Sequence, residues 1–195
     1  MANYTSLPDP KTDSEISLEQ TILKRRSVRK FSNRDLSLEQ TSQILWAAQG
    51  ITDKKMGFRS APSAGAIYPL EIYIVKSDGL FRYIPDGHKL QALSSDDLRS
   101  DLSKAALGQG FVKETGADIV ITAVFGRIAA RYGQRGTMYA YVEAGHVAQN
   151  IHLQAVSLGL GSCPVGAFNG TDVKKVLSLP EDEEPIYIIP VGYLK

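Results

Sequence analysis

Four residues near the N-terminus combine side chains that bind anions. They lie in the stretch LKRRSVRKFS, residues 23–32, where five of the ten residues are Lys or Arg. Arginine binds a phosphate through parallel N–H groups, and a serine hydroxyl adds one more donor. The sequence therefore predicts a site for one phosphate group, made by Arg25, Arg26, Ser27 and Arg29. The structural alternative is a solvated basic helix end, which the helix dipole favours.

Two segments of small residues could accept a flat ligand. The first, RSAPSAGAIYPLEIYIV over residues 59–75, runs directly into a predicted strand. The second, GLGSCPVGAF over residues 159–168, follows the longest predicted helix. Small residues let backbone N–H and C=O groups approach a ligand closely. The alternatives are a plain loop for the first segment, and a helix cap followed by a loop for the second.

The other reactive side chains give weaker signals. His88, His146 and His152 lack zinc-ligand spacing, so we expect core or interface histidines and no metal site. Cys163 is the only cysteine, which excludes an intrachain disulfide, and we expect a packed thiol. The segment RIAARYGQRG, residues 127–136, is either a solvated loop or part of a substrate mouth or nicotinamide-cofactor site. Its candidate ligand-facing residues are Arg127, Arg131, Tyr132 and Arg135, of which Arg131 and Tyr132 are taken as substrate candidates.

Length and composition limit the classes of function. The chain has 195 residues, of which 43% are hydrophobic and 22% charged, as is ordinary for one globular domain. A formal net charge of +1 argues against a general nucleic-acid binder, which needs a broad basic face. No apolar run approaches the roughly 20 residues that cross a bilayer, and the first residues lack a signal-peptide pattern. We therefore expect a cytoplasmic protein with neither a nucleic-acid nor a membrane partner.

The beginning of the chain suggests an arm and two capped helices. Residues 1–14 are polar and contain Pro8 and Pro10, so we expect an extended arm before a single domain over residues 15–195. The letters SLEQ occur at residues 17–20 and again at residues 37–40. In each copy the serine can cap a helix while the glutamine reaches back to it, which predicts two capping boxes.

The remaining pattern predicts an α+β fold. Apolar alternation, apolar runs and turn signals predict strands over residues 71–76, 80–84, 118–125 and 185–193. Helices are expected over residues 97–107 and 138–161, the second with Ala140, Ala144 and Ala148 free to face the core or a second chain. Pro190 indicates an edge or a bend in the last strand. Without regular βαβ alternation, we expect helices flanking a mixed, mainly antiparallel sheet.

Together these segments resemble the nitroreductase family of FMN-dependent oxidoreductases. RRSVRKF is similar to the phosphate and ribityl motif of that family, and APSAGAIYPLEIY is similar to its variant in the SagB-type dehydrogenase branch. That branch is related to oxidases of thiazoline and oxazoline rings. The stretches DGLFRYIPDGHKL, EAGHVAQNIHLQAVSLGLGSCPVGAF and EEPIYIIPVGY also resemble the branch, so the likeness extends over residues 17–193.

The resemblance implies a homodimer with two FMN sites, each built from both chains. In one chain the basic cluster would hold the phosphate, the ribityl chain and the pyrimidine edge of FMN. The other subunit would line the flavin with Pro62, Ser63, Ala64 and Gly65. The ring system would lie along Pro164, Val165, Gly166 and Ala167, with the Gly166 N–H near flavin N5. Lys195 would help to hold the phosphate, and Ala66 and Tyr68 stand where many members have Asn and Gln, with Tyr68 a candidate substrate contact.

The function that the resemblance implies is electron transfer from NAD(P)H through flavin N5 to a small acceptor, such as a nitroaromatic or a quinone. The flavin carries the chemistry, so no side chain is expected as a catalytic acid, base or nucleophile. One alternative is a SagB-type dehydrogenase or oxidase acting on an azoline-like ring. Others are a non-catalytic flavin-binding module and a phosphate or nucleic-acid binder that uses the basic cluster alone.

Overall fold

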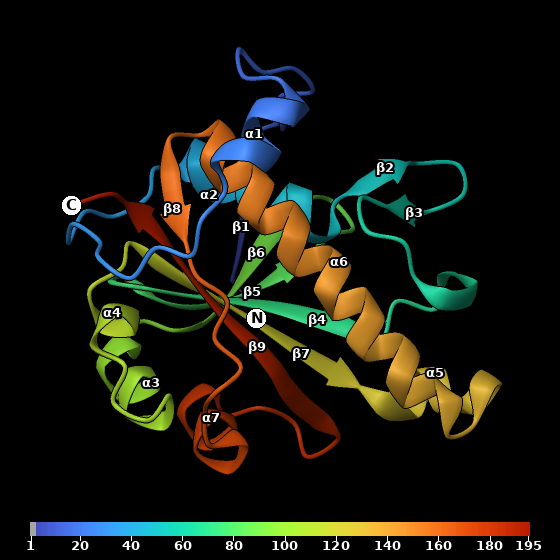
Figure 1. The fold of residues 1–195 in the computed structure, drawn as a ribbon. Helices are drawn as coiled ribbons and strands as arrows, with labels where there is room; N and C mark the ends of the chain where they lie inside the picture. Colours follow the sequence, from blue (N-terminus) through green and yellow to red (C-terminus); the bar gives the residue numbers. More distant parts are fainter. Residues whose placement is uncertain (1–2) are drawn as a thin grey trace.

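The fold is built on one seven-stranded sheet. The computed structural model describes residues 3–195, and its strands lie in the order β1-β6-β5-β4-β7-β9-β8 (Figure 1). The strands are β1 (Tyr4–Ser6), β4 (Leu70–Lys76), β5 (Gly79–Ile84), β6 (Lys89–Ser94), β7 (Ala117–Val124), β8 (Leu160–Ser162) and β9 (Glu183–Tyr193). Each neighbouring pair among them is antiparallel. The expected α+β class is confirmed, and the only parallel pairing in the described residues is an isolated bridge between Ser27 and Ser162.

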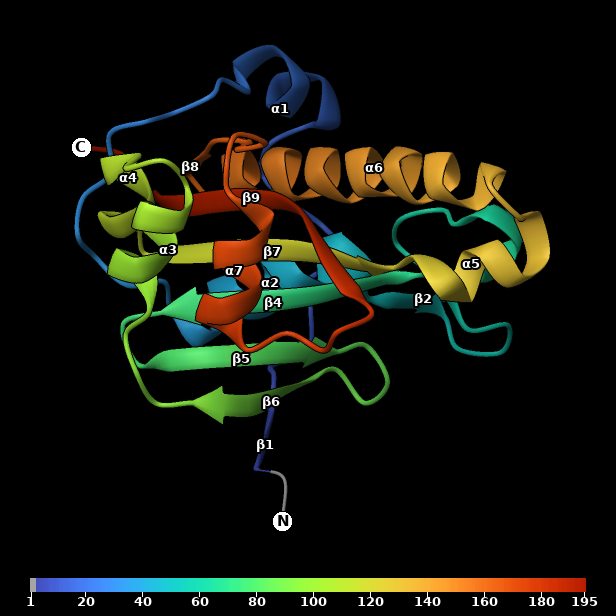
Figure 2. The same ribbon diagram turned by 90° about the horizontal axis from the view of Figure 1, so that it is seen from below.

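Helices cover both faces of this sheet. They are α1 (Leu18–Lys24), α2 (Leu38–Gln49), α3 (Arg99–Ala105), α4 (Gly110–Lys113), α5 (Phe125–Tyr132), α6 (Arg135–Ser157) and α7 (Gly170–Leu177). Two apolar clusters result, one under α2 and α6 and the other under α3, α4 and α7. Figure 2 shows α3 and α7 in front of the sheet and α2 behind it. Among the described residues, no helix is both long and apolar enough to span a membrane.

The central strand β7 supplies alternate side chains to the two clusters. Ile119 and Ile121 belong to the cluster under α2 and α6, whereas Val120 belongs to the cluster on the opposite face. All three side chains are fully buried. The expected strand over residues 118–125, buried on both faces, is therefore present with a shift of one residue. This run of β-branched residues suits a strand that has no solvent-facing side.

The two SLEQ copies behave differently. At α2 the capping box is complete, because Gln40 N–H donates to Ser37 Oγ at 3.2 Å and Ser37 N–H donates to Gln40 Oε1 at 3.0 Å. At α1 only the first half forms, with Gln20 N–H donating to Ser17 Oγ at 3.3 Å. The predicted return bond from the Gln20 side chain is absent among the described residues, so that part of the prediction is wrong.

Helix α6 was expected over residues 138–161 and runs from Arg135 to Ser157. Ala140, Ala144 and Ala148 are buried in the chain's own core, in the cluster that also contains Ile44 of α2. These three alanines were expected to face either the core or a second chain, and they face the core. Residues 127–136 do not form a loop, because they span the end of α5 and the beginning of α6.

Pro190 lies inside the sheet and not at its edge. It is opposite Asp118 of β7, and the edge on that side of the sheet is formed by β8. Its carbonyl accepts from the Cys163 N–H at 3.2 Å, just after β8 ends at Ser162. The missing N–H of proline is tolerated there because the regular β8 ladder has already stopped. Of the expected extended arm over residues 1–14, residues 1–2 lie outside the described residues, and Tyr4–Ser6 form β1, which pairs with β6.

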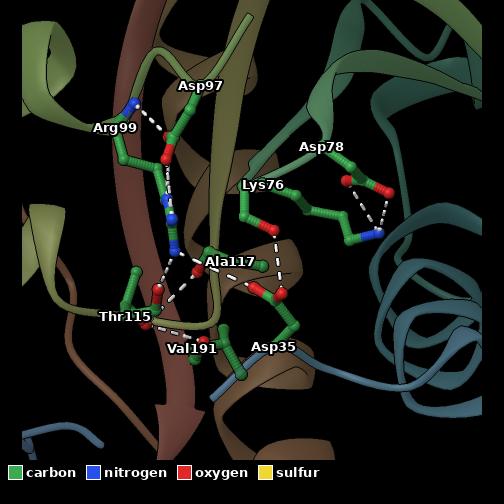
Figure 3. Close-up of polar contacts among 9 residues, drawn as sticks. Asp35, Lys76, Asp78, Asp97, Arg99, Thr115, Ala117 and Val191 are labelled. Atoms are coloured by element: carbon green, nitrogen blue, oxygen red, sulfur yellow. Dashed lines mark hydrogen bonds and ion pairs between the residues drawn. The ribbon is translucent and has the colours of Figure 1, made fainter. Parts of the chain in front are cut away.

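A buried arginine, Arg99, joins three parts of the chain through hydrogen bonds (Figure 3). Arg99 Nη1 donates to the Thr115 carbonyl at 2.8 Å, and Arg99 Nη2 is 2.7 Å from Asp97 Oδ2. Thr115 Oγ1 in turn donates to the Val191 carbonyl at 2.7 Å. The start of α3, the approach to β7 and the end of β9 are therefore held in one hydrogen-bonded group. Because Arg99 is mostly buried, removing Asp97 would leave its charge without a partner, which costs more than at an exposed site.

The edge strand β8 brings distant parts of the chain together through Gly161. A Cβ atom at this position would lie 2.9 Å from Val28 Cβ and 2.7 Å from Leu194 Cδ2. Val28 N–H donates to the Ser162 carbonyl at 2.9 Å, so the segment after α1 runs directly along β8. Leu194 in turn bridges Phe31, which places the C-terminus beside the same segment.

We expect Gly161→Ala to destabilise the chain by about 1–3 kcal/mol, because the added methyl group overpacks against the stiff Val28 side chain. The matched control is Gly126→Ala in α5, where a Cβ would meet nothing within 4 Å beyond the backbone of its own helix. This control should be neutral or slightly stabilising. The measurement is the free energy of unfolding in denaturant, and equal values for the two variants would contradict the role given to Gly161.

Candidate functional site

Two of the three predicted segments meet at β8. The hydrogen bond from Val28 N–H to Ser162 O and the bridge between Ser27 and Ser162 place the basic segment next to this strand. The small-residue loop 163–167 begins where β8 ends. The anion-binding side chains and the loop expected to face a ring system therefore lie side by side, although more than 130 residues separate them in the sequence.

The basic cluster divides into two kinds of side chain. Arg26 folds back on α1, where its Nη1 donates to the Leu23 carbonyl at 3.0 Å and to the Arg25 carbonyl at 2.7 Å. The structural alternative considered above, a basic helix end, thus describes Arg26. Arg25 and Arg29 form no ion pair with any described residue, and Ser27 is exposed. Two uncompensated guanidinium groups therefore remain for an anion.

His152 of α6 lies next to this cluster. Its side chain is buried, and Nδ1 lies 2.6 Å from Ser162 Oγ. Burial, and to a lesser extent the nearby Arg25 guanidinium, lower the pKa of His152 to about 4. Its Nε2 has no hydrogen-bond partner among the described residues. The imidazole is therefore neutral at physiological pH and contributes a buried polar atom beside the basic cluster.

The loop 163–167 is paired with β9 and leaves the amides of Gly166 and Ala167 without an acceptor among the described residues. Val165 N–H donates to the Ile188 carbonyl at 2.8 Å, and Ile188 N–H donates back at 3.0 Å. Gly166 is exposed, and its N–H donates to none of the described residues. Cys163 is fully buried, and burial raises the pKa of its thiol against an opposing effect of Arg29. The expectation of a packed thiol is consistent with this environment, and the free amides of Gly166 and Ala167 are able to face a ligand.

The third segment lies away from the other two, beside α5 on the right of Figure 1. Gly65 has φ of +62°, which glycine adopts without strain. A Cβ there would lie 2.8 Å from Tyr132 Oη and 2.9 Å from Arg131 Nη1. Pro62 and Gly65 are exposed, and Ser63 and Ala64 are half-buried. The fold therefore gathers this segment with two of the predicted substrate-facing residues.

Tyr68, the third substrate candidate, points into the protein. Its side chain is 9% exposed, and its hydroxyl accepts from Arg59 N–H at 3.0 Å. Its carbonyl accepts from Arg127 Nη1 at 2.8 Å, so Arg127 also serves the structure. Exposed Arg131 and half-buried Tyr132 are available to a ligand in this conformation, whereas the Tyr68 ring is withdrawn. Lys195 is exposed, one residue beyond the bridge that joins Leu194 to Phe31.

Comparison with known proteins identifies the family. A family model described as "Nitroreductase family" matches residues 22–193, which is most of the chain. The chain belongs to the nitroreductase family. The matched region includes the whole basic cluster, the PSAG segment (residues 62–65) and the loop after β8, so the resemblance is confirmed at the level of the family.

Individual relatives agree with this assignment. A protein of Methanocaldococcus jannaschii named "Putative nitroreductase" is 42% identical over 184 residues, which cover 91% of each chain. The crystal structure of a "putative nitroreductase" from Ralstonia eutropha superposes with a TM-score of 0.90 at 34% identity, covering 98% of this chain and 90% of that one. An "FMN reductase (NADPH)" of Bacillus subtilis is 23% identical over 188 residues, 89% of this chain and 64% of that protein.

Sequence reasoning missed two buried polar contacts of the site region. One is the pairing of His152 with Ser162, and the other is a group of polar side chains around Glu143 of α6. Glu143 is 1% exposed on a helix whose buried face is otherwise mostly alanine and aliphatic. A carboxylate within such a face is a signal for a buried polar partner. The sequence alone, however, does not say which side chain reaches it.

The lowered pKa of His152 predicts a pH-dependent stability. The pKa of His152 in the folded protein lies below the ordinary value of 6.5. The contribution of His152 to stability is therefore fully present above pH 6.5 and is lost as the pH falls toward about 4. Between pH 7 and pH 5 the loss from this one residue is about 2 kcal/mol. We expect His152→Asn to remove that part of the pH dependence. The matched control, His146→Asn at an exposed position of α6, should retain it.

The measurement is the difference in unfolding free energy between the two pH values for each variant. If His152→Asn and His146→Asn lose stability equally on acidification, His152 is not the group that titrates.

Proposed function

We propose that the chain is an FMN-dependent oxidoreductase that passes electrons from NAD(P)H to a small acceptor such as a nitroaromatic or a quinone. The observation that carries the proposal is the junction at β8, where the segment with two unpaired guanidinium groups runs along the strand from which the loop with the free Gly166 amide continues. A phosphate with an attached planar ring system requires cationic donors at one end and backbone donors at the other. FMN has this form, and the name of the Bacillus relative supports it.

Each group of residues has a separate task in this proposal. Arg25 binds the phosphate, with Ser27 as a further donor, and Lys195, which follows the Leu194–Phe31 bridge, assists. Arg29, which is near Cys163, stabilises negative charge at the pyrimidine side of the ring. Bound FMN supplies the hydride chemistry, and the protein supplies binding, orientation and electrostatics. Gly166 N–H orients the ring, and Arg131 and Tyr132 face the substrate.

The position of the PSAG segment supports a dimer. It lies beside α5, away from the basic cluster, so a second chain would bring it to the site. Helix α6 also has an exposed apolar face, formed by Met138, Tyr141 and Val142 at positions i, i+3 and i+4. These side chains are 46%, 54% and 49% exposed. A contiguous apolar patch of this kind is typical of a protein–protein interface.

The first test is the visible spectrum of the purified protein, followed by mass spectrometry of the released cofactor and anaerobic mixing with NADH or NADPH. We expect a yellow protein that contains FMN and is bleached by one of the two nucleotides. A flavin that neither nucleotide reduces would support the azoline oxidase or the non-catalytic module. A colourless protein that FMN does not bind would contradict the proposal.

Arg25→Ala should weaken FMN binding by about ten- to a hundredfold, because a charge-assisted hydrogen bond contributes about 1.5–3 kcal/mol. Lys104→Ala is the matched control, since it removes one charge from an exposed position of α3. It should bind FMN as the original protein does. The measurement is an FMN titration of each apoprotein at fixed salt, and normal affinity in Arg25→Ala would show that the phosphate is bound elsewhere.

Val142→Asp should separate the dimer and release FMN, because burying an unpaired carboxylate in an apolar interface is strongly unfavourable. Leu107→Asp is the control, as this residue is 69% exposed and lies after α3, away from α6 (Figure 1). Light scattering with detection of flavin absorbance gives mass and cofactor content together. A stable monomer that retains stoichiometric FMN would contradict the proposed shared site.

A further inference from the structure

A row of hydrogen-bonded polar side chains connects helix α6 with the PSAG segment. Glu143 Oε1 accepts from Gln49 Nε2 at 3.1 Å, and Gln49 Oε1 accepts from Arg59 Nη1 at 3.1 Å. Gln49 and Glu143 are both almost fully buried, at 0% and 1% exposure. Three elements, α2, α6 and β3 (Phe58–Arg59), therefore meet through one hydrogen-bonded row.

The row continues into the PSAG segment itself. The Arg59 guanidinium stacks over the Tyr68 ring at 4.4 Å, and Arg59 N–H donates to the Tyr68 hydroxyl at 3.0 Å. Tyr68 N–H donates to Ser63 Oγ at 2.9 Å. The segment that follows Ser63 includes Gly65, Ala66 and Tyr68 in left-handed conformations, with φ of +62°, +53° and +53°. Non-glycine residues adopt such conformations only where surrounding contacts hold them.

One end of the row lacks a hydrogen bond. Glu143 Oε2 is buried and has no hydrogen-bond partner among the described residues. Helix α6 packs against the turn Ala64–Ala66 that follows Ser63, and the Ser63 hydroxyl lowers the pKa of the Glu143 carboxyl, so the two side chains are neighbours although no hydrogen bond joins them. A buried oxygen without a partner is costly, and Ser63 is the neighbouring group able to provide one.

The protonation of Glu143 is set by its surroundings. Burial raises the pKa of the carboxyl above the ordinary value of 4.5, and Ser63 and Gln49 oppose this effect. The charged groups that face it are Arg59 of β3 and Arg127 of α5, which also favour ionisation. The helix that carries Glu143, α6, also contains the titratable side chain of His146, which is exposed to solvent. Burial outweighs these groups, so the carboxyl keeps its proton to a higher pH than an exposed glutamate does.

We propose that protonated Glu143 donates a hydrogen bond from Oε2 to Ser63 Oγ. The Ser63 hydroxyl proton is thereby directed away from Glu143, toward the exposed side of the PSAG segment, where the ligand would lie. A serine oxygen accepts two hydrogen bonds, here from Tyr68 N–H and from the Glu143 O–H, which leaves its own proton for an external acceptor. When Glu143 loses its proton to solvent, the carboxylate becomes an acceptor and draws the Ser63 O–H inward. Glu143 is thus a positioning residue for Ser63.

This inference rests on the proposed function for the identity of the ligand, because Ser63 was predicted to line the flavin of the partner subunit. The Glu143–Ser63 contact itself involves only residues of this chain. Two experiments separate these parts, one on the apoprotein and one with FMN as the probe.

The first experiment records infrared difference spectra between the apoprotein and each of its variants, in the region of the carboxyl bands. Glu143→Gln should remove one band of a protonated carboxyl group, and Ser63→Ala should shift that band because the carboxyl loses its acceptor. Asp118 provides an internal control: it is fully buried on the opposite face of the sheet, and burial raises its pKa well above the ordinary value. Its band should stay unchanged in both variants. No band lost in Glu143→Gln, or no shift in Ser63→Ala, would overturn the proposal.

The second experiment measures FMN affinity as a function of pH. The original protein should bind FMN more weakly, by about three- to tenfold, as the pH rises through the raised pKa of Glu143, because one neutral hydrogen bond is lost. Glu143→Gln should bind at the low-pH affinity throughout, since its amide N–H replaces the O–H donor at all pH values. Ser63→Ala should bind at the weaker level throughout, and the double variant should match Ser63→Ala.

The outcomes are distinct. If Glu143→Gln retains the pH dependence of the original protein, Glu143 has only a packing role and the proposal is wrong. If the infrared bands behave as expected but no variant binds FMN at any pH, the Glu143–Ser63 hydrogen bond stands and the proposed function fails.

Discussion

Strand β7 has β4 on one side and β9 on the other, and every residue from Ala117 to Ala123 is buried. A strand without a solvent-facing side requires apolar layers on both faces. Helices α2 and α6 supply one layer, and α3, α4 and α7 supply the other. The connecting loops extend from this arrangement, including the two segments that meet at β8 and the PSAG segment beside α5.

The site itself is placed by the edge of the sheet. Strand β8 has only three residues, yet it pairs with β9 and with the segment after α1 at the same time. Gly161 permits this because its missing side chain leaves room for Val28 and Leu194. The basic segment, the loop 163–167 and the C-terminus are thereby brought to one place. A short edge strand covered by other segments is also protected from pairing with other chains.

Buried polar groups are concentrated where segments must be held in unusual positions. His152 and Ser162 pair beside the basic cluster, and the row from Glu143 to Ser63 supports a segment with three left-handed residues. Arg99 likewise holds the segment just before β7, because its guanidinium donates to the Thr115 carbonyl. Satisfied buried polar networks restrict the local conformation more than apolar packing does, because each partner must have one geometry. The two oxygens of Asp118 and one of Glu143 remain without partners in the described residues.

Local pattern was sufficient to predict the elements that depend on nearby residues. The strands around residues 71–76, 80–84 and 118–125 and the second capping box could be read from the sequence, because alternation, apolar runs and caps act over a few residues. The family could also be recognised, because its motifs are short and occur in a fixed order. The sequence did not reveal that Pro190 lies inside the sheet or that Tyr68 turns inward, and it left open whether the basic cluster binds an anion or ends a helix, as Arg26 does. Nor did it reveal the partners of His152 and Glu143. Those outcomes depend on contacts between residues far apart in the chain, which exist only after β8, α6 and the segment after β3 have packed on the sheet.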